Sequence, residues 1–263
     1  MKAAYLRLLG HLGLLLPYFR SRERLRSLGA EVVAAGPDGL PLPPPVLMIR
    51  VAGTTDAAWF LEGGRLAEES IRAALGRAGA PLGSLEAILD FGCGCGRVLR
   101  RWHDLDARVC GSDLSGPAIQ WCRRHLPFVA VGVNALEPPL TYGDASFDLV
   151  YALSVFSHLP VKTQLAWRDE LGRVLRPGGH LLLTLHGDAY AEQLTGEERR
   201  TYADGECVVR WAEVAGSNFC MTFHPPVFVR DRLADGFELV EHVPRGALGN
   251  PEQDLVLLRR PGS

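Results

Sequence analysis

The chain has 263 residues, of which 47% are hydrophobic and 22% charged, and this balance predicts a folded globular protein with material for one substantial core. The formal net charge of −2 gives the whole chain no attraction for nucleic acid, so we expect no nucleic-acid partner. The leucine-rich run at 12–16 is too short to span a bilayer and is not followed by a small-residue cleavage site. We therefore expect a cytoplasmic protein without stable membrane insertion.

The six cysteines are spaced unlike those of a metal site. There is no Cys-x-x-Cys pair and no zinc-type Cys/His spacing, so we expect no bound metal. We expect the six thiols to be reduced, as in a cytosolic protein, and most of them to serve in packing. The six are Cys93, Cys95, Cys110, Cys122, Cys207 and Cys220.

The first predicted element is a helix over 3–28, because leucines recur on one face and arginines occupy the others. Such a helix packs on its own domain or on a second subunit. Alternatively it is a mobile lid, or a basic amphipathic helix that rests on a membrane surface. The sequence leaves these interpretations, and the oligomeric state, open.

A proline- and glycine-rich stretch, 36–45, predicts an extended connector, and an apolar segment follows at 46–51. Thr55 or Asp56 can cap a helix that carries Trp59 and Phe60. A second helix is expected at about 65–79. We therefore treat 1–83 as an N-terminal helical and lid region that precedes a domain at 84–263.

From residue 86 strands alternate with helices, which predicts a parallel sheet covered on both faces. The strands are expected at 86–91, 108–112, 128–131, 147–153 and 180–186. Helices are expected at 96–104, through 118–122, and after Pro160 until the Pro-Gly-Gly stop at 177–179.

The last two strands, 237–243 and 254–260, have no room for a crossover helix between them and should pair as an antiparallel hairpin. The intervening stretch, 187–236, is an insertion suited to capping a substrate site. Within it we expect a helix at 189–203, β-like segments at 207–211 and 218–223, and a helix at 227–234.

A glycine-rich loop follows the first strand of the sheet. Gly92, Gly94 and Gly96 alternate with other residues just after Asp90, and glycine allows both a sharp turn and the close approach of a ligand to bare backbone. Asp113 ends the second strand, where its carboxylate would face the same crevice. It can accept hydrogen bonds from ribose hydroxyls, or it can merely cap the next helix.

Further features fall in the same order along the chain. Asn134-Ala135 follows the third strand, Phe147-Asp148-Leu149-Val150 opens the fourth with Ser157-His158-Leu159 behind it, and Arg176-Pro-Gly-Gly precedes the fifth. With the glycine loop and Asp113, this order resembles class I S-adenosylmethionine-dependent methyltransferases, most strongly over 84–186. The resemblance implies an α/β, Rossmann-like three-layer sandwich. Its seven-stranded, mostly parallel sheet has the order 3-2-1-4-5-7-6, with strand 7 antiparallel.

The resemblance also implies the cofactor, S-adenosyl-L-methionine, with S-adenosyl-L-homocysteine as product. Asp90 and the 92–96 backbone would hold its methionine end, and Asp113 the ribose. The remaining matches are Leu114 near the adenine, Asn134 and Ala135 at the adenine edge, and Ser154 beside the methionine moiety. A dehydrogenase is disfavoured, because its Gly-x-Gly-x-x-Gly spacing is not found here: Arg97 and Val98 follow the third glycine.

Methyl transfer asks the protein mainly for orientation and exclusion of water, and for a base when the acceptor is a hydroxyl. His158, just past the fourth strand, is our candidate base, although it can equally pack at the start of the next helix. His186 and His224 are the alternatives. Aromatic and apolar side chains from 1–83 and from the insertion would wall the substrate pocket. They are Trp59, Phe60, Tyr190, Trp211, Phe219, Met221 and Phe223.

Such a lidded site suits a small or medium organic acceptor, and we expect methylation of a hydroxyl oxygen in a secondary metabolite or sugar-bearing compound. Methyltransferases of DNA amines resemble one another in an Asp/Asn-Pro-Pro-aromatic tetrapeptide, whereas this chain has Ser154-Val155-Phe156-Ser157 at that place. A methyltransferase of protein or RNA, and a cofactor-binding protein that does not methylate, remain as alternatives.

Overall fold

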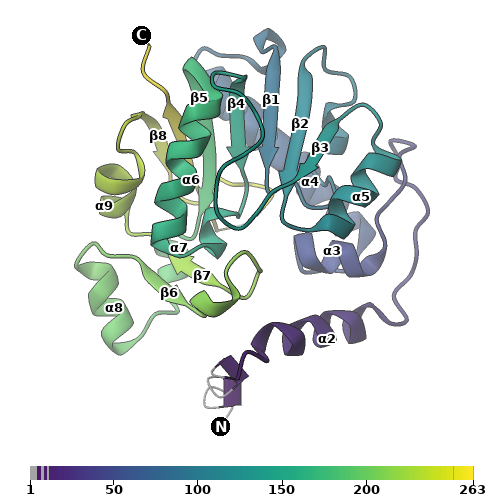
Figure 1. Ribbon diagram of the computed structural model, residues 1–263, viewed down its shortest axis with the longest axis horizontal. Coiled ribbons are helices and arrows are strands. Elements are labelled where there is room, and N and C mark those ends of the chain that lie inside the picture. The colour runs from purple at the N-terminus through teal and green to yellow at the C-terminus, as the bar shows by residue number, and fades with distance from the viewer. Residues whose placement is uncertain (1–4, 7–8, 11, 251, 263) are drawn as a thin grey trace.

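The central feature of the computed structural model is a seven-stranded sheet with the order β3-β2-β1-β4-β5-β9-β8 (Figure 1). The structure describes residues 5–6, 9–10, 12–250 and 252–262. Counted along the chain, this is the predicted order 3-2-1-4-5-7-6, because β6 and β7 form a separate two-stranded sheet. β9 is antiparallel to both of its neighbours, as expected for the seventh strand. The α/β, Rossmann-like fold is therefore confirmed.

The bounds of the elements agree with most of the predicted ranges. The strands of the large sheet are β1 (Ala87–Phe91), β2 (Arg108–Asp113), β3 (Ala130–Val133), β4 (Phe147–Ala152), β5 (Leu175–Leu185), β8 (Glu238–Val243) and β9 (Asp254–Arg259), and the small sheet contains β6 (Val208–Arg210) and β7 (Met221–Phe223). The helices are α2 (Leu15–Ser27), α3 (Pro45–Ala52), α4 (Ala57–Arg77), α5 (Gly116–His125), α6 (Val161–Val174), α7 (Asp188–Ala191), α8 (Gly196–Ala203) and α9 (Pro226–Phe228).

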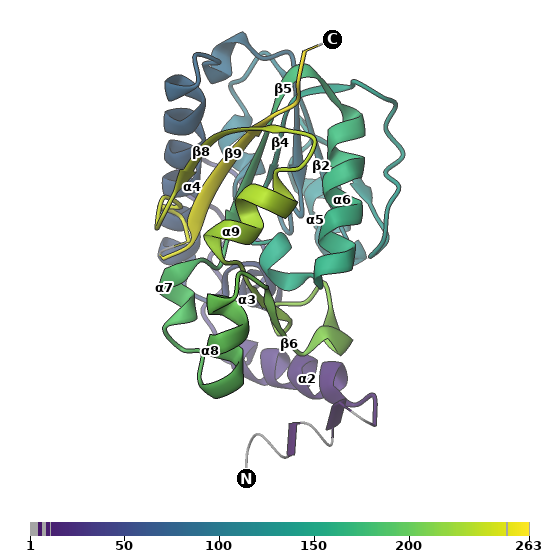
Figure 2. The ribbon, with the colours of Figure 1, turned by 90° about the vertical axis from the view of Figure 1, so that its left-hand side faces the viewer.

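Alternate residues of the strands face two separate apolar clusters, which gives the three layers. Ile88 belongs to the cluster that α4 and α5 cover, and Leu89 to the cluster that α6 and α9 cover. Figure 2 shows α4 and α6 on opposite faces of the sheet. Because α4 shares its core with β1, this helix is part of the layered structure as well as of the N-terminal region.

Three predicted helices differ in the structure. The range 96–104 contains only a 3₁₀ turn, Leu99–Trp102, because the glycine loop continues in turns as far as residue 98. The two helices expected between 57 and 79 form one continuous helix, α4, which begins after Asp56; its carboxylate accepts hydrogen bonds from the N–H groups of Ala58 and Trp59.

Two further differences concern glycine. The helix expected over 189–203 is split into α7 and α8 at Gly196, which has φ +53°. The helix expected over 3–28 is confirmed at the described residues 5–6 and 9–10 and from Leu15 to Ser27, and a turn in which Gly13 adopts φ +66° interrupts it. Residues 3–4, 7–8 and 11 of that range lie outside the described residues.

The extended connector at 36–45 is held to the core by a buried ion pair. Arg100, whose side chain is 2% exposed, donates to both carboxylate oxygens of Asp38 at 2.6 and 2.8 Å and also to the carbonyl oxygens of Leu40 and Pro41. Burial alone would raise the pKa of Asp38, but the hydrogen bonds and charge of Arg100 leave it below its ordinary value.

We expect Asp38→Ala to lower the free energy of unfolding by about 3 kcal/mol, because the Arg100 charge would stay buried without a carboxylate. Urea denaturation at neutral pH measures this, with Asp231→Ala, which removes an exposed ion pair, as the control. The depressed pKa stabilises the fold above pH 3.8, and this contribution is lost as the pH falls through the folded-state pKa. Equal midpoints for the two variants would contradict the assignment.

Candidate active site

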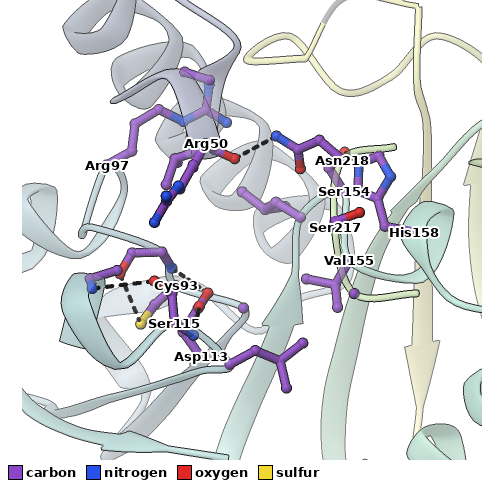
Figure 3. A pocket seen from close by; sticks show the side chains of 18 of the residues that line it. Arg50, Cys93, Arg97, Asp113, Ser115, Ser154, Val155, His158, Ser217 and Asn218 are labelled. Carbon is purple, nitrogen blue, oxygen red and sulfur yellow. Dashed lines mark hydrogen bonds between the residues drawn. The ribbon is translucent and has the colours of Figure 1, made fainter. Parts of the chain in front are cut away.

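A cleft of ≈850 Å³ opens at the carboxyl ends of the parallel strands, where α2, α3 and the β6–β7 sheet gather at one end of the molecule (Figure 1). Residues that directly follow four neighbouring strands line this cleft, as is usual for ligand sites in open α/β sheets. They are Gly92 after β1, Leu114 after β2, Leu153 after β4, with Ser154 next to it, and His186 after β5. Figure 3 shows Arg50 and Arg97 on one side of the cleft and Ser154 and His158 on the other.

The glycine loop is folded against the end of β2. The N–H groups of Gly92 and Cys93 both donate to the Ser112 carbonyl, at 2.7 and 3.0 Å. Gly92 and Gly94 have φ +83° and +54°, a region that favours glycine, and a Cβ on either would collide with the side chain of Val155 or Val51. The loop therefore presents bare backbone to the cleft.

Asp113 ties the glycine loop to the start of α5. Its Oδ2 accepts from the Gly94 N–H at 2.8 Å and its Oδ1 from the Ser115 N–H at 2.7 Å. Burial raises the pKa of Asp113, and these two backbone hydrogen bonds oppose the rise. Ser115, not Asp113, caps α5, since its hydroxyl accepts from the Ala118 N–H. Each carboxylate oxygen keeps a second lone pair for a ligand hydroxyl.

The part of the cleft next to Asp113 has apolar lining residues. Leu114 and Leu136 line the cleft and are 38% and 37% exposed, which is high for large apolar side chains. Asn134 and Ala135 line the same part of the cleft. The Asn134 side-chain oxygen accepts from the Ser112 hydroxyl at 2.6 Å, so one of its two lone pairs is already used. Leu114 and Leu136 lie together beside Gly216 and offer apolar surface to the cleft.

Asp90 ends β1 beneath the loop and is 4% exposed. Burial raises its pKa to about 8, the hydrogen bond with Tyr151 lowers it, and the negative charge of Asp113 adds to the rise. Asp90 therefore holds a proton at neutral pH. The thiols of Cys93 and Cys95 are also buried, and their pKa values lie well above 9.0, which makes both packing groups and not nucleophiles.

Ser154 is held in a strained conformation, φ +60°, by a buried hydrogen-bond network. Its N–H donates to Thr184 Oγ1 at 2.7 Å, and Gln253 Nε2 donates to its hydroxyl at 2.8 Å. Thr184 in turn donates to Gln253 Oε1 at 2.7 Å. The network fixes the Ser154 hydroxyl beside His158, whose Nε2 lies 3.4 Å away.

His158 is oriented by a carbonyl from the insertion. Its Nδ1 lies 2.6 Å from the Cys220 carbonyl oxygen, and a carbonyl can only accept, so Nδ1 carries the proton and Nε2 carries a lone pair. Burial lowers the pKa of His158 from 6.5, and the bond to Cys220 opposes this only in part. The imidazole is therefore neutral at physiological pH, with a basic nitrogen beside Ser154.

His186 lines the cleft next to His158, but it is a weaker base. Burial lowers its pKa to about 3, and the nearby imidazole of His158 acts in the same direction. Its ring stacks on Tyr190 with centroids 4.0 Å apart. The Nδ1 atoms of His186 and His224 are buried without a hydrogen-bond partner among the described residues.

The structure brings most of the predicted site residues together. The cofactor candidates that line the cleft are Asp90, Gly92, Gly94, Asp113, Leu114, Asn134, Ala135 and Ser154. The substrate candidates that line it are Trp59, His158, His186, Tyr190, Phe219 and Met221.

Five predicted residues do not line the cleft. Gly96 packs instead on α5, where a Cβ would lie 2.5 Å from Leu126 Cδ1, so its glycine serves the turn. The other four belong to cores or to the far side of the insertion, because the period of each element turns them away from the cavity. They are Phe60, which is fully buried, Trp211, Phe223, and His224, which bonds Gln164 Oε1 at 3.1 Å.

Sequence reasoning missed several cleft residues. Arg50 on α3 lines the cleft and pairs with Glu23 of α2 at 3.2 Å. Arg97 is 5% exposed and donates to Asn250 Oδ1 at 2.9 Å, and Gln253 holds Ser154. The sequence signal for Gln253 and Asn250 is weak, since both precede the last strand and reach the site only because β9 lies beside β5. Among the described residues no cluster of His, Cys, Asp and Glu is arranged to hold a metal ion.

The fold and this cleft define an α/β protein with a cleft across the carboxyl ends of its parallel strands. Residues 89–183 match the family model of a methyltransferase domain. A solved S-adenosylmethionine-dependent methyltransferase from Mesorhizobium loti has the same fold, with a TM-score of 0.54 at 21% identity over 74% of this chain and 100% of that chain. This chain therefore has the α/β, Rossmann-like fold of that solved protein, and its residues 89–183 are similar to a methyltransferase domain.

Two curated relatives are similar over part of the sequence. O-methyltransferase cnsE of Penicillium expansum is 29% identical over 59% of this chain and 53% of its own length. The 27-O-demethylrifamycin SV methyltransferase of Amycolatopsis mediterranei is 33% identical over 48% of either chain. The chain thus spans about half the length of these relatives.

Proposed function

We propose that this protein is an S-adenosylmethionine-dependent methyltransferase that methylates a hydroxyl oxygen of a small or medium organic acceptor. The observation that carries the proposal is the arrangement within one cleft: a glycine loop and Asp113 at one end, and at the other a neutral imidazole with a fixed basic nitrogen. The assignment of Asp90, Asp113 and the other cofactor contacts, and of His158 as base, belongs to this proposal.

The residues present fit the cofactor. Leu114 and Leu136 expose apolar surface that would flank the adenine, and Asp113 would accept from the ribose hydroxyls. Bare backbone at Gly92 and Gly94 would allow the methionine end to approach, and protonated Asp90 could donate a hydrogen bond there. When bound, S-adenosylmethionine supplies an electrophilic methyl group on a sulfonium.

The protein side of the reaction is orientation and proton removal. His158 Nε2 would accept the proton of the acceptor hydroxyl, while the Cys220 carbonyl stabilises the imidazolium through Nδ1–H. Ser154, fixed by Gln253 and Thr184, would hold the hydroxyl or the imidazole in place.

The size and lining of the cleft support a small or medium acceptor. Trp59, Tyr190, Phe219 and Met221 give it apolar walls, and its ≈850 Å³ must also accommodate the cofactor. The names of both relatives refer to O-methylation, which supports oxygen as the methylated atom.

Transfer from methyl-labelled S-adenosylmethionine tests the proposal. The protein would be incubated with hydroxyl-bearing metabolites and, separately, with total protein and RNA. Label in the small-molecule fraction is expected. Label confined to protein or RNA would instead support the second candidate, and cofactor binding without any transfer would point to a non-methylating protein.

A further inference from the structure

The outer face of α2 carries an apolar stripe. Leu14, Leu25 and Leu28 are 48%, 67% and 73% exposed. Leu25 lies on α2 and Leu14 and Leu28 cap its two ends, and with Pro17 and Ser21 these residues follow one another at intervals of three or four residues. The opposite side of α2 is buried through Leu15 and Phe19. Phe19 stacks on Phe219 with centroids 3.7 Å apart. The helix is thus anchored to the domain by one face and shows the other to its surroundings.

Arginines flank this stripe on both sides. Arg20 and Arg24, which also line the cleft, follow one edge, and Arg22 follows the other; Arg26 is turned toward the domain and donates to the Gly53 carbonyl oxygen at 2.9 Å. The only acid of α2, Glu23, is 8% exposed on the inner side and pairs with Arg50. The flanks are therefore positive without an acid on the outer face of the helix.

The charge is also distributed unevenly along the chain. Residues 1–30 hold six of the 28 Lys and Arg and one of the 30 Asp and Glu, so this segment is strongly positive while the rest of the chain is negative. Figures 1 and 2 agree that α2 lies at the outer end of the molecule, beyond α3 and the small sheet.

We propose that α2 docks on an anionic phospholipid surface, with the stripe Leu14–Leu25–Leu28 at the acyl boundary and the arginines at the headgroups. An apolar stripe with cationic flanks is the arrangement of interfacial helices, and long arginine side chains keep their charge in the headgroup layer. A second copy of the chain is a poor occupant, because two such positive faces repel each other. No helix among the described residues is long and apolar enough to cross a membrane, so contact would be at the surface.

Docking would place the mouth of the cleft at the lipid surface, because Leu16, Arg20 and Arg24 of α2 line the cleft. An acceptor carried in the membrane could then enter it directly. This last consequence rests on the proposed function, whereas the docking itself does not.

Co-sedimentation with vesicles tests the docking. We expect the protein to bind vesicles of phosphatidylcholine mixed with phosphatidylglycerol, to bind vesicles of phosphatidylcholine alone much less, and to be released by salt. Arg22→Gln should weaken binding about fivefold, since each cation near an anionic surface contributes about 1 kcal/mol. The double variant Leu25→Ser/Leu28→Ser should weaken it at least about tenfold.

The control is Arg124→Gln, which removes an exposed arginine from α5. None of the substituted residues lines the cleft, and circular dichroism with thermal unfolding would show that the variants fold. Equal sedimentation of wild type, Leu25→Ser/Leu28→Ser and Arg124→Gln would overturn the proposal. So would a concentration-dependent dimer that the double variant abolishes, or saturable binding to an acidic protein in place of lipid. Cofactor affinity, measured in solution without vesicles, would report separately on the proposed function.

Discussion

Replacing Asp113 with alanine is expected to weaken S-adenosylmethionine binding by about 10²–10⁴-fold. The variant would lack the two charge-assisted hydrogen bonds that the Asp113 carboxylate would accept from ribose hydroxyls, each of which contributes about 1.5–3 kcal/mol. It would also release the Gly94 N–H, which Asp113 holds at 2.8 Å, and so loosen the loop that presents bare backbone to the cofactor. Isothermal titration calorimetry measures the effect directly and needs no acceptor.

Two further variants separate ligand binding from loop structure. Asp113→Asn keeps one acceptor oxygen but turns an N–H₂ group toward a backbone donor, so an intermediate affinity is expected. Asp106→Ala, at the amino end of the same strand region and exposed, should bind like wild type. If Asp113→Ala folds normally and binds the cofactor as wild type does, the cofactor site lies elsewhere.

The second large effect is expected on turnover. His158→Ala should lower kcat by about 10²–10⁴-fold with a hydroxyl acceptor, because the proton would have no general base, while cofactor affinity stays nearly unchanged. Because burial lowers the pKa of His158, its imidazole is still mostly neutral at pH 6.5 and becomes protonated only at a lower pH. The rate of the wild type should therefore fall only as the pH drops through this lowered pKa, and the acidic limb should be absent from the variant.

Imidazole added to His158→Ala should restore part of the rate, which a purely structural role of the histidine would not allow. His103→Ala, an exposed histidine away from the cleft, is the matched control. An unchanged kcat, or an acidic limb that persists in His158→Ala, would remove His158 from the mechanism and direct attention to Ser154.

The cofactor half of the cleft could be predicted because it depends on local pattern, whereas the strand order was implied by the resemblance to class I methyltransferases. Alternating strands and helices admit few topologies, and residues that directly follow parallel strands must meet at one edge. Asp113 and Ser154 line the cleft, as expected for that reason. Gly96 does not line it, because glycine spacing cannot distinguish contact with a cleft from packing on α5.

The substrate half depended on tertiary structure. Within the insertion the sequence could not tell which aromatic residues face the cavity, so Phe219 and Tyr190 line it while Trp211 and Phe223 do not. The short elements there have no long period to read, and their orientation is set by packing between segments far apart in the chain, such as Phe219 on Phe19.

The sequence by itself determined the alternation of strands and helices, and the loop and carboxylates at the ends of the first two strands, because period and strand ends are local properties of the chain. Only the tertiary structure decided which nitrogen of His158 is basic, since the Cys220 carbonyl that accepts the hydrogen bond from Nδ1–H lies 62 residues away. It also decided which face of α2 is buried, since the partner of that face comes from the insertion. Long-range packing and hydrogen bonding fix such choices, and neither is written in the spacing of neighbouring residues.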